Sequence, residues 1–156
     1  MAGRKLIKIT RTIVVNKNAA TVFNFFANPS NDSLWRTEIN QSLLNGPLAV
    51  GARVAEYSFL SKKAPNNLVE LACIEYAKDS LAVFETPENA PFYLRSRRQV
   101  TAVADEATAL HYSIEFDAAL VTFAVGFPLP RFIISFKANS DMKKYLKQLK
   151  VQLEKG

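Results

Sequence analysis

The sequence is poor in the residues on which several kinds of functional site depend. Among 156 residues it has one cysteine, one histidine and five glycines. A single cysteine excludes an internal disulfide framework, and Cys73 lies in a strand-like run where a small buried hydrophobic residue is expected. A cysteine–histidine metal site would lack ligands, and the glycines form no phosphate-binding loop. We therefore predict neither a metal nor a cofactor.

Signals that direct a chain into or across a membrane are also missing. The N-terminal residues MAGRKLIKIT carry charges where a signal peptide needs an apolar core. The apolar stretch 118–130 is too short for a transmembrane helix, and Pro128, Pro130 and Arg131 interrupt its continuation. The sequence thus predicts a cytoplasmic protein without stable membrane insertion.

The basic residues are in excess but are not concentrated. The formal net charge is +6, a surplus that can attract nucleic acid or an anionic membrane surface. Basic residues occur at Arg95, Arg97, Arg98 and along the C-terminal segment, without a basic run interleaved with aromatics and without a nucleic-acid motif. Solvated surface charge is the favoured interpretation. We expect no nucleic-acid partner, and either a monomer or a homodimer.

What the chain does have is apolar material. Hydrophobic residues make up 49% of the sequence and include eleven phenylalanines. This length and composition predict one folded domain, residues 1–156, with a single core.

The last quarter of the chain, from about Leu129 to Lys155, predicts a long amphipathic helix. Steps of three and four residues place one set of side chains on a common face. That set is Phe132, Phe136, Asn139, Met142, Leu146, Leu149 and Leu153. Asn139 interrupts the apolar stripe. Either the helix breaks there and Ser140 caps a second segment, or the amide faces a space that is not fully packed.

The preceding chain is expected to be mainly strands. Alternation of apolar and polar residues and turn signals predict strands at 5–15, 39–45, 52–61, 68–77, 81–86, 92–103 and 107–117. Asn18 is expected to cap a first short helix over 19–28, and a second runs from Asn31 to Thr37.

Several short motifs occur in an order that resembles the START-like, birch-pollen-allergen-like (SRPBCC) superfamily of polyketide cyclase/dehydrase and lipid-transport type. The first strand runs into NKNAATVFNFFAN, and Pro29 and Trp35 follow in the second short helix. Asn45-Gly46-Pro47 and Val50-Gly51 are similar to the family's turn before the third strand. The end of the chain, with Leu146, Leu149, Leu153 and Glu154, is similar to its C-terminal Leu-Lys…Leu-Glu run.

The resemblance implies an α+β helix-grip fold. A curved antiparallel sheet of about six or seven strands would wrap around the long C-terminal helix, with two short helices after the first strand. It also implies a hydrophobic cavity between sheet and helix that binds a lipid, sterol or polyketide-like molecule. The superfamily shares no catalytic signature, so the fold leaves the chemistry open.

Candidate ligand-binding residues are those expected to line this cavity. They are Arg11, Trp35, Tyr57, Phe59, Phe84, Arg98, Tyr112, Phe132, Phe136 and Asn139. The aromatic members could equally fill the space as core. Arg11 stands on the apolar side of its strand, either as an edge residue reaching solvent or as a cation facing the cavity.

Two further functions stay open. A cyclase or dehydratase would use Glu70 or Glu75, whichever points inward, as general base, with Arg11 or Arg98 stabilising an enolate. His111 falls on the polar face of its strand, which makes a histidine-based triad improbable, and no catalytic residue is assigned. Alternatively, residues 118–130 form an apolar lip for a protein or an anionic membrane rather than a buried lead-in to the last helix.

Overall fold

The computed structural model describes residues 4–155; residues 1–3 and 156 of the predicted domain lie outside the described part. The elements in chain order are β1 (Leu6–Val15), α1 (Ala19–Phe26), the 3-10 helix η1 (Pro29–Leu34), β2 (Ile39–Asn45), β3 (Arg53–Ser58), β4 (Asn67–Ala77), β5 (Leu81–Glu85), β6 (Leu94–Ala104), β7 (Ala107–Asp117), α2 (Ala118–Val125) and α3 (Arg131–Lys155). Among residues 4–155, no helix is both long enough and apolar enough to cross a membrane.

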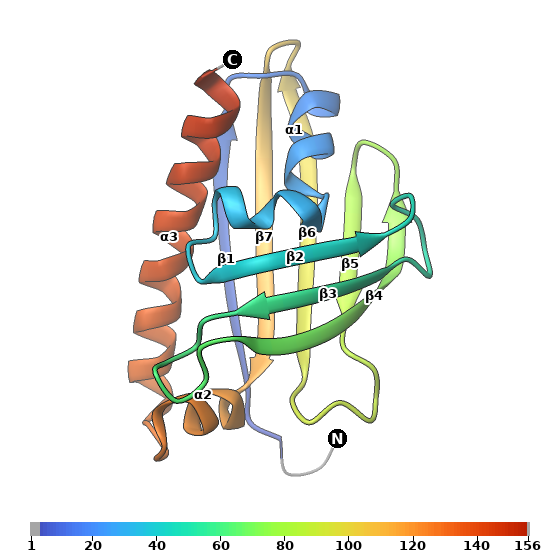
Figure 1. The fold of residues 1–156 in the computed structure, drawn as a ribbon. Coiled ribbons are helices and arrows are strands. Elements are labelled where there is room, and N and C mark those ends of the chain that lie inside the picture. Colours follow the sequence, from blue (N-terminus) through green and yellow to red (C-terminus); the bar gives the residue numbers. More distant parts are fainter. Residues whose placement is uncertain (1–3, 156) are drawn as a thin grey trace.

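The seven strands form one antiparallel sheet in the order β1-β7-β6-β5-β4-β3-β2. The sheet is strongly curved, so that β2 and β3 cross in front of β1, β6 and β7 at a steep angle (Figure 1). Helix α3 stands against β1, and η1 packs on β2 and next to α1 (Figure 1). This is the predicted helix-grip α+β fold.

Local hydrogen bonds explain where the short helices begin and end. Asn18 accepts a hydrogen bond from the Thr21 amide at 2.9 Å and caps α1, as expected. Asn28 caps η1 in the same way, and Asp117 caps α2. Gly126 ends α2 with a φ of +98°, a conformation that favours glycine.

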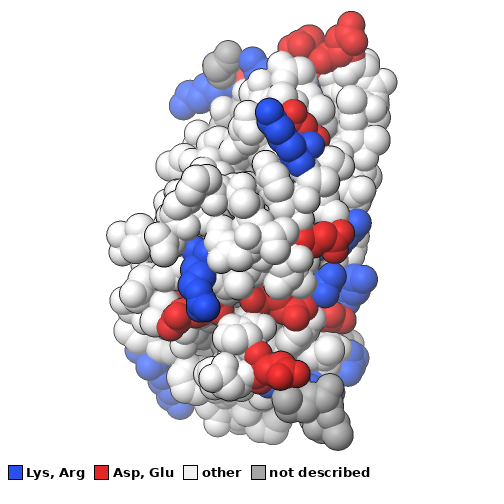
Figure 2. Space-filling view, turned by 90° about the vertical axis from the view of Figure 1, so that its right-hand side faces the viewer, with Lys and Arg blue, Asp and Glu red and all other residues white. Residues whose placement is uncertain are grey.

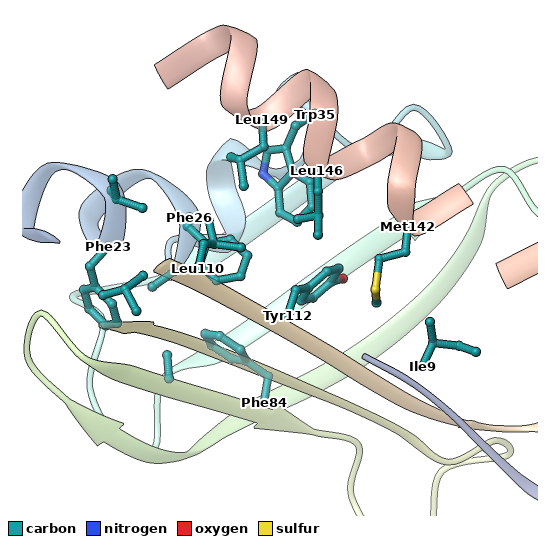
Figure 3. Close-up of a cluster of buried hydrophobic side chains, with 14 of the residues drawn as sticks. Ile9, Phe23, Phe26, Trp35, Phe84, Leu110, Tyr112, Met142, Leu146 and Leu149 are labelled. Carbon is teal, nitrogen blue, oxygen red and sulfur yellow. The ribbon is translucent and has the colours of Figure 1, made fainter. Parts of the chain in front are cut away.

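The upper half of the space between sheet and α3 is filled by a packed core. Figure 3 shows Phe23 and Phe26 from α1, Trp35 after η1, and Leu146 and Leu149 from α3 converging on the strands. All five are fully buried or nearly so. This packing fixes α1, η1 and α3 against the sheet, and it ends near Tyr112 and Met142, below which the interior is not filled.

The face that α3 presents to the sheet differs from the predicted stripe in its first two turns. Ile134, Ala138 and Met142 face inward, whereas Phe132 and Phe136 are 74% and 78% exposed. The prediction followed the large apolar residues, but one helical face cannot hold both sets. From Met142 onward the predicted stripe of Met142, Leu146, Leu149 and Leu153 is buried as expected.

Both interpretations of Asn139 are wrong. Helix α3 is continuous from Arg131 to Lys155, so it does not break at this position. The Asn139 amide is half-buried and does not line the cavity. Instead Nδ2 donates a hydrogen bond to the Ser135 carbonyl at 3.1 Å, which satisfies the polar group within the helix itself.

The face shown in Figure 2 carries charges of both signs. Lysine, arginine, aspartate and glutamate side chains are interspersed there, separated by uncharged surface. On this face the positive net charge is therefore not gathered into a basic patch of the kind that binds nucleic acid.

Candidate functional site

A cavity of about 670 Å³ lies between the inner face of the sheet, η1, α2 and the first half of α3. Pockets for small molecules usually have volumes of about 300–1,000 Å³. The cavity begins where the packed core ends. Tyr112 and Met142 mark this boundary, and Figure 3 shows their side chains reaching toward one another from β7 and α3.

The register of the sheet gives the cavity one polar and one apolar end. In the row nearest the core, Arg98 of β6 lies opposite Tyr112 of β7. One row closer to α2 comes Ser96 opposite Ile114, and the next row is Leu94 opposite Phe116. Each step of two residues along β6 and β7 keeps the same face. The wall therefore becomes apolar toward α2.

Helices α2 and α3 complete the apolar end. Together with Leu129 between them, they contribute mainly aliphatic side chains and alanines, with Met142 at the inner limit: Leu120, Val121, Ala124, Val125, Ile133, Ile134, Ala138 and Met142. Lys137, Asp141 and Tyr145 of α3 also line the cavity. A ligand portion seated here would be removed from water against hydrocarbon surface, which is the main source of favourable free energy for apolar binding.

The polar end is built around a buried ion pair between Asp32 of η1 and Arg98. Arg98 Nη1 and Nη2 donate to the two Asp32 carboxylate oxygens, each at 2.7 Å. The two residues are 0% and 2% exposed. Arg98 also donates from Nε to Ser96 and from Nη1 to the Phe26 carbonyl. Such a bidentate pair fixes η1 over the sheet.

Aromatic rings surround the same guanidinium. The Arg98 Cζ atom lies 5.5–5.9 Å from the ring centroids of Phe26, Trp35, Phe84 and Tyr112. Cations over aromatic faces are stabilised by the ring quadrupole, which contributes to the burial of this charge. Burial acts to lower the pKa of Arg98, but the Asp32 carboxylate outweighs burial, so the pKa lies above its usual value.

Arg36 extends the network from η1 to β2 and β3. Its Nη1 donates to Asp32 at 3.0 Å and to Glu56 at 2.6 Å. Its Nη2 lies 3.5 Å from a Glu38 carboxylate oxygen. Burial raises the pKa of Glu38 and is only partly opposed by Arg36. Burial likewise raises the pKa of Tyr112, which therefore stays a neutral phenol at neutral pH.

Four of the predicted ligand-binding residues line the cavity: Phe59, Phe84, Arg98 and Tyr112. Trp35 is fully buried core, and its indole Nε1 has no hydrogen-bond partner within residues 4–155. Arg11 has the inward parity but lies half-buried on the edge strand β1, outside the cavity lining. Whether any of these residues binds a ligand stays a prediction.

The remaining predicted positions do not line the cavity. Phe132, Phe136 and Asn139 lie on α3 as described above, away from the cavity lining. Tyr57 is half-buried on the opposite face of β3, because the inward residues of this strand are Val54, Glu56 and Ser58. The sequence interpretation of β3 favoured the aromatic face as the inner one, and the cavity is instead lined there by a carboxylate and a hydroxyl.

The predicted inward carboxylate was also assigned to the wrong strand. Glu70 and Glu75 of β4 are both exposed, since a register shift between Cys73 and Glu75 interrupts the alternation. The carboxylates that line the cavity are Asp32, Glu38, Glu56 and Asp141, the last of which pairs with Lys137 on α3. The i, i+4 spacing of Asp32 and Arg36 was a usable signal for this network. Nothing in the local sequence marks Glu38.

Other sequence-level interpretations agree with the structure. His111 lies on the outer face, with Nδ1 3.0 Å from the Thr12 hydroxyl, and does not line the cavity. Cys73 is a free, buried thiol. Within residues 118–130, Val121 lines the cavity whereas Phe123 and Phe127 are 51% and 57% exposed. Their role as a lip for a protein or a membrane stays a prediction.

No family model matches the chain, and no curated protein matches it significantly. Solved structures do. A START superfamily protein from Mycobacterium smegmatis aligns with a TM-score of 0.74 at 12% identity, covering 95% of this chain and 97% of that one. The Zhui aromatase/cyclase from Streptomyces aligns with a TM-score of 0.71 at 13% identity, covering 96% and 94%.

A protein of unknown function from Staphylococcus aureus aligns with a TM-score of 0.74 at 5% identity, covering 99% of this chain and 98% of that one. These likenesses extend over nearly the whole chain. The fold is therefore START-like, as the resemblance implied. At such identities the likeness concerns the fold, and the function has to be argued from the cavity.

Proposed function

We propose that the chain acts as one domain that binds a hydrophobic small molecule, lipid, sterol or polyketide-like, in the cavity between the sheet and α3. The observation that carries the proposal is a space of about 670 Å³ with apolar walls and a buried charged network at one end. Apolar walls supply affinity and a few fixed polar groups supply orientation, which is the usual construction of a small-molecule site.

The proposal is tested with Nile red, a neutral dye whose fluorescence rises in apolar surroundings. The informative variant is Ala138→Phe, which adds a ring to a side chain that lines the cavity. Gln148→Phe adds the same ring at an exposed position of the same helix and serves as the matched control. Circular dichroism shows that all three proteins are folded.

We expect saturable binding of Nile red at one site in the native protein and in Gln148→Phe, with affinity reduced at least about tenfold in Ala138→Phe. Trp35 is the single tryptophan, and its ring centroid lies 5.5 Å from that of Tyr112, which lines the cavity. Its fluorescence therefore gives a second readout of dye binding. Equal binding by all three proteins would place the dye elsewhere, and no binding by the native protein would refute the proposal.

A cyclase or dehydratase that uses the same cavity is the second candidate. It is favoured by the Glu38 carboxylate, which lines the cavity and whose pKa burial raises, as a general base requires. The aromatase/cyclase neighbour agrees with it at the level of fold. A test is to incubate the protein with a linear aromatic polyketone and to search by mass spectrometry for a cyclised product lighter by one water. If the native protein forms the product and Glu38→Gln does not, an enzyme is supported. If Glu38→Gln forms the product at the rate of the native protein, this role for Glu38 is excluded.

A third candidate is docking of the cavity mouth on an anionic bilayer through residues 118–130. Phe123 and Phe127 are more than half exposed, and the Lys63 ammonium lies beside Gly126 at the end of α2. Apolar side chains next to cations suit an anionic interface. We expect sedimentation with phosphatidylcholine/phosphatidylserine vesicles, lost in Phe123→Ser/Phe127→Ser. Equal sedimentation with neutral vesicles, or none, would refute this role.

A further inference from the structure

The charged end of the cavity contains acceptor oxygens that the protein leaves without a donor. Glu56 is 5% exposed and lines the cavity. One of its carboxylate oxygens accepts from Arg36 at 2.6 Å, and the other has no hydrogen-bond partner among residues 4–155. Glu38 Oε1, shielded from solvent, accepts no close hydrogen bond within that range, although the Tyr145 hydroxyl interacts with the same carboxylate. A buried acceptor without a donor costs free energy, which a suitable ligand would recover.

A free hydroxyl accompanies these oxygens. Tyr112 is 2% exposed and lines the cavity, and its phenol makes no hydrogen bond within the described chain. Its electrostatic neighbours include Arg36 and Glu38. Figure 3 shows the hydroxyl end of the ring directed toward Met142 rather than into the packed core. As a neutral phenol, this group can donate to an oxygen atom of a ligand.

The guanidinium groups, by contrast, are occupied by the protein. All three nitrogens of Arg98 donate to Asp32, Ser96 or the Phe26 carbonyl. Both terminal nitrogens of Arg36 face carboxylates. Three carboxylates therefore meet two guanidiniums, which leaves an excess of negative charge. A ligand carboxylate would be repelled here, contrary to the usual expectation for an arginine-lined pocket.

We infer that the polar end of the ligand is a neutral hydroxyl group on an otherwise apolar molecule. This hydroxyl donates to the free oxygen of Glu56 or Glu38 and accepts from the Tyr112 phenol, while the hydrocarbon part lies against α2 and the first half of α3. A hydroxyl is the smallest group that both donates and accepts. The inference rests on the proposed binding function and names the ligand class of the same cavity.

Three probes of equal chain length separate this ligand class from its alternatives. Decanol carries the hydroxyl, decyl methyl ether keeps the oxygen acceptor but lacks the donor, and decanoate at pH about 8 is an anion. Each probe competes with bound Nile red. We expect the native protein to bind decanol at least about tenfold more tightly than either of the other two, since both leave the carboxylate acceptor unpaired.

Substitutions then assign the two partners. Glu56→Gln and Glu38→Gln replace a charged acceptor with the weaker amide oxygen, and at least one of them should clearly reduce the decanol-to-ether affinity ratio. Tyr112→Phe removes a donor that both oxygens use, so it should weaken decanol and ether by similar factors and keep the ratio. Glu70→Gln, on the exposed side of β4, is the matched control and should change nothing.

The outcomes distinguish this inference from the proposed function. If Nile red binds but decanol does not exceed the ether, or decanoate binds as tightly as decanol, the inference is overturned and apolar binding stands. A native preference for decanol that both glutamine variants retain undiminished also overturns it. If neither Nile red nor any probe binds, the proposed function itself fails. The comparison in the native protein requires no variant to fold.

Discussion

Asp32→Ala should be among the most damaging single substitutions in this protein. The Asp32 carboxylate accepts two hydrogen bonds from Arg98 at 2.7 Å and one from Arg36 at 3.0 Å. Its removal leaves the Arg98 guanidinium, 2% exposed, without a counter-charge. Removing one partner of a buried pair typically costs about 3–5 kcal/mol. Because a domain is usually stable by only about 5–15 kcal/mol, a large share of the stability would be lost.

A double variant tests whether the unpaired Arg98 guanidinium causes the loss of stability in Asp32→Ala. In Asp32→Ala/Arg98→Met no unpaired guanidinium remains, so this double variant should be more stable than Asp32→Ala alone. Lys137→Ala provides the surface control: it breaks the Lys137–Asp141 pair at 2.7 Å, but Lys137 is 73% exposed. The expected cost of that change is about 0–1 kcal/mol.

Equilibrium unfolding in urea, followed by far-ultraviolet circular dichroism, measures all three free energies of unfolding. The reasoning would be refuted if Asp32→Ala cost no more than Lys137→Ala. It would also be refuted if the double variant were less stable than Asp32→Ala. The cost of Asp32→Ala would then not arise from the buried Arg98 charge that the substitution leaves without a partner.

Three further predictions concern α3, the end of α2 and the titration of the cavity. Met142→Ala should cost about 2–5 kcal/mol in urea unfolding, whereas Phe136→Ser, at a position 78% exposed, should stay within about 0.5 kcal/mol; the reverse order would mean that the observed face of α3 is wrong. Gly126→Ala should lower the stability by about 1–2 kcal/mol, because its φ is +98°, and an unchanged melting midpoint would contradict this backbone argument. The pKa of Glu38 lies above its usual value of 4.5 because of burial, so the native state holds the proton more tightly and loses stability as pH rises from 4.5 through the raised pKa. Since glutamine does not titrate, the stability of Glu38→Gln relative to the native protein should increase over that window, and a difference independent of pH would contradict the assignment.

The fold was predictable because its signals are repeated along the chain. Each strand of the predicted sheet contributes its own alternation. In β7 the apolar residues Leu110, Tyr112 and Phe116 are buried as their alternation predicts, whereas in β6 the predicted inner face holds at Val100 but not at Ala102, which is exposed. The order of the motifs then restricted the topology. An error of one or two residues at a strand end leaves such a prediction intact.

The site was less predictable because its lining violates the rule that apolar faces point inward. In β3 the inner face carries Glu56 and Ser58, and their partners come from Asp32 and Arg36 in a separate segment. A carboxylate pointing inward is stable only when these distant groups meet it, and periodicity contains no information about them. The same rule misplaced Phe136, since an exposed aromatic residue at a helical spacing looks like core in sequence.

The central claim, that the cavity binds an apolar molecule, is tested most directly by native mass spectrometry of freshly purified protein, before and after incubation with decanol. The account predicts a one-to-one adduct in the native protein that is lost on denaturation, and its absence in Ala138→Phe under the same conditions. An adduct that persists undiminished in Ala138→Phe would contradict the claim, as would a native protein that carries no adduct even at saturating decanol.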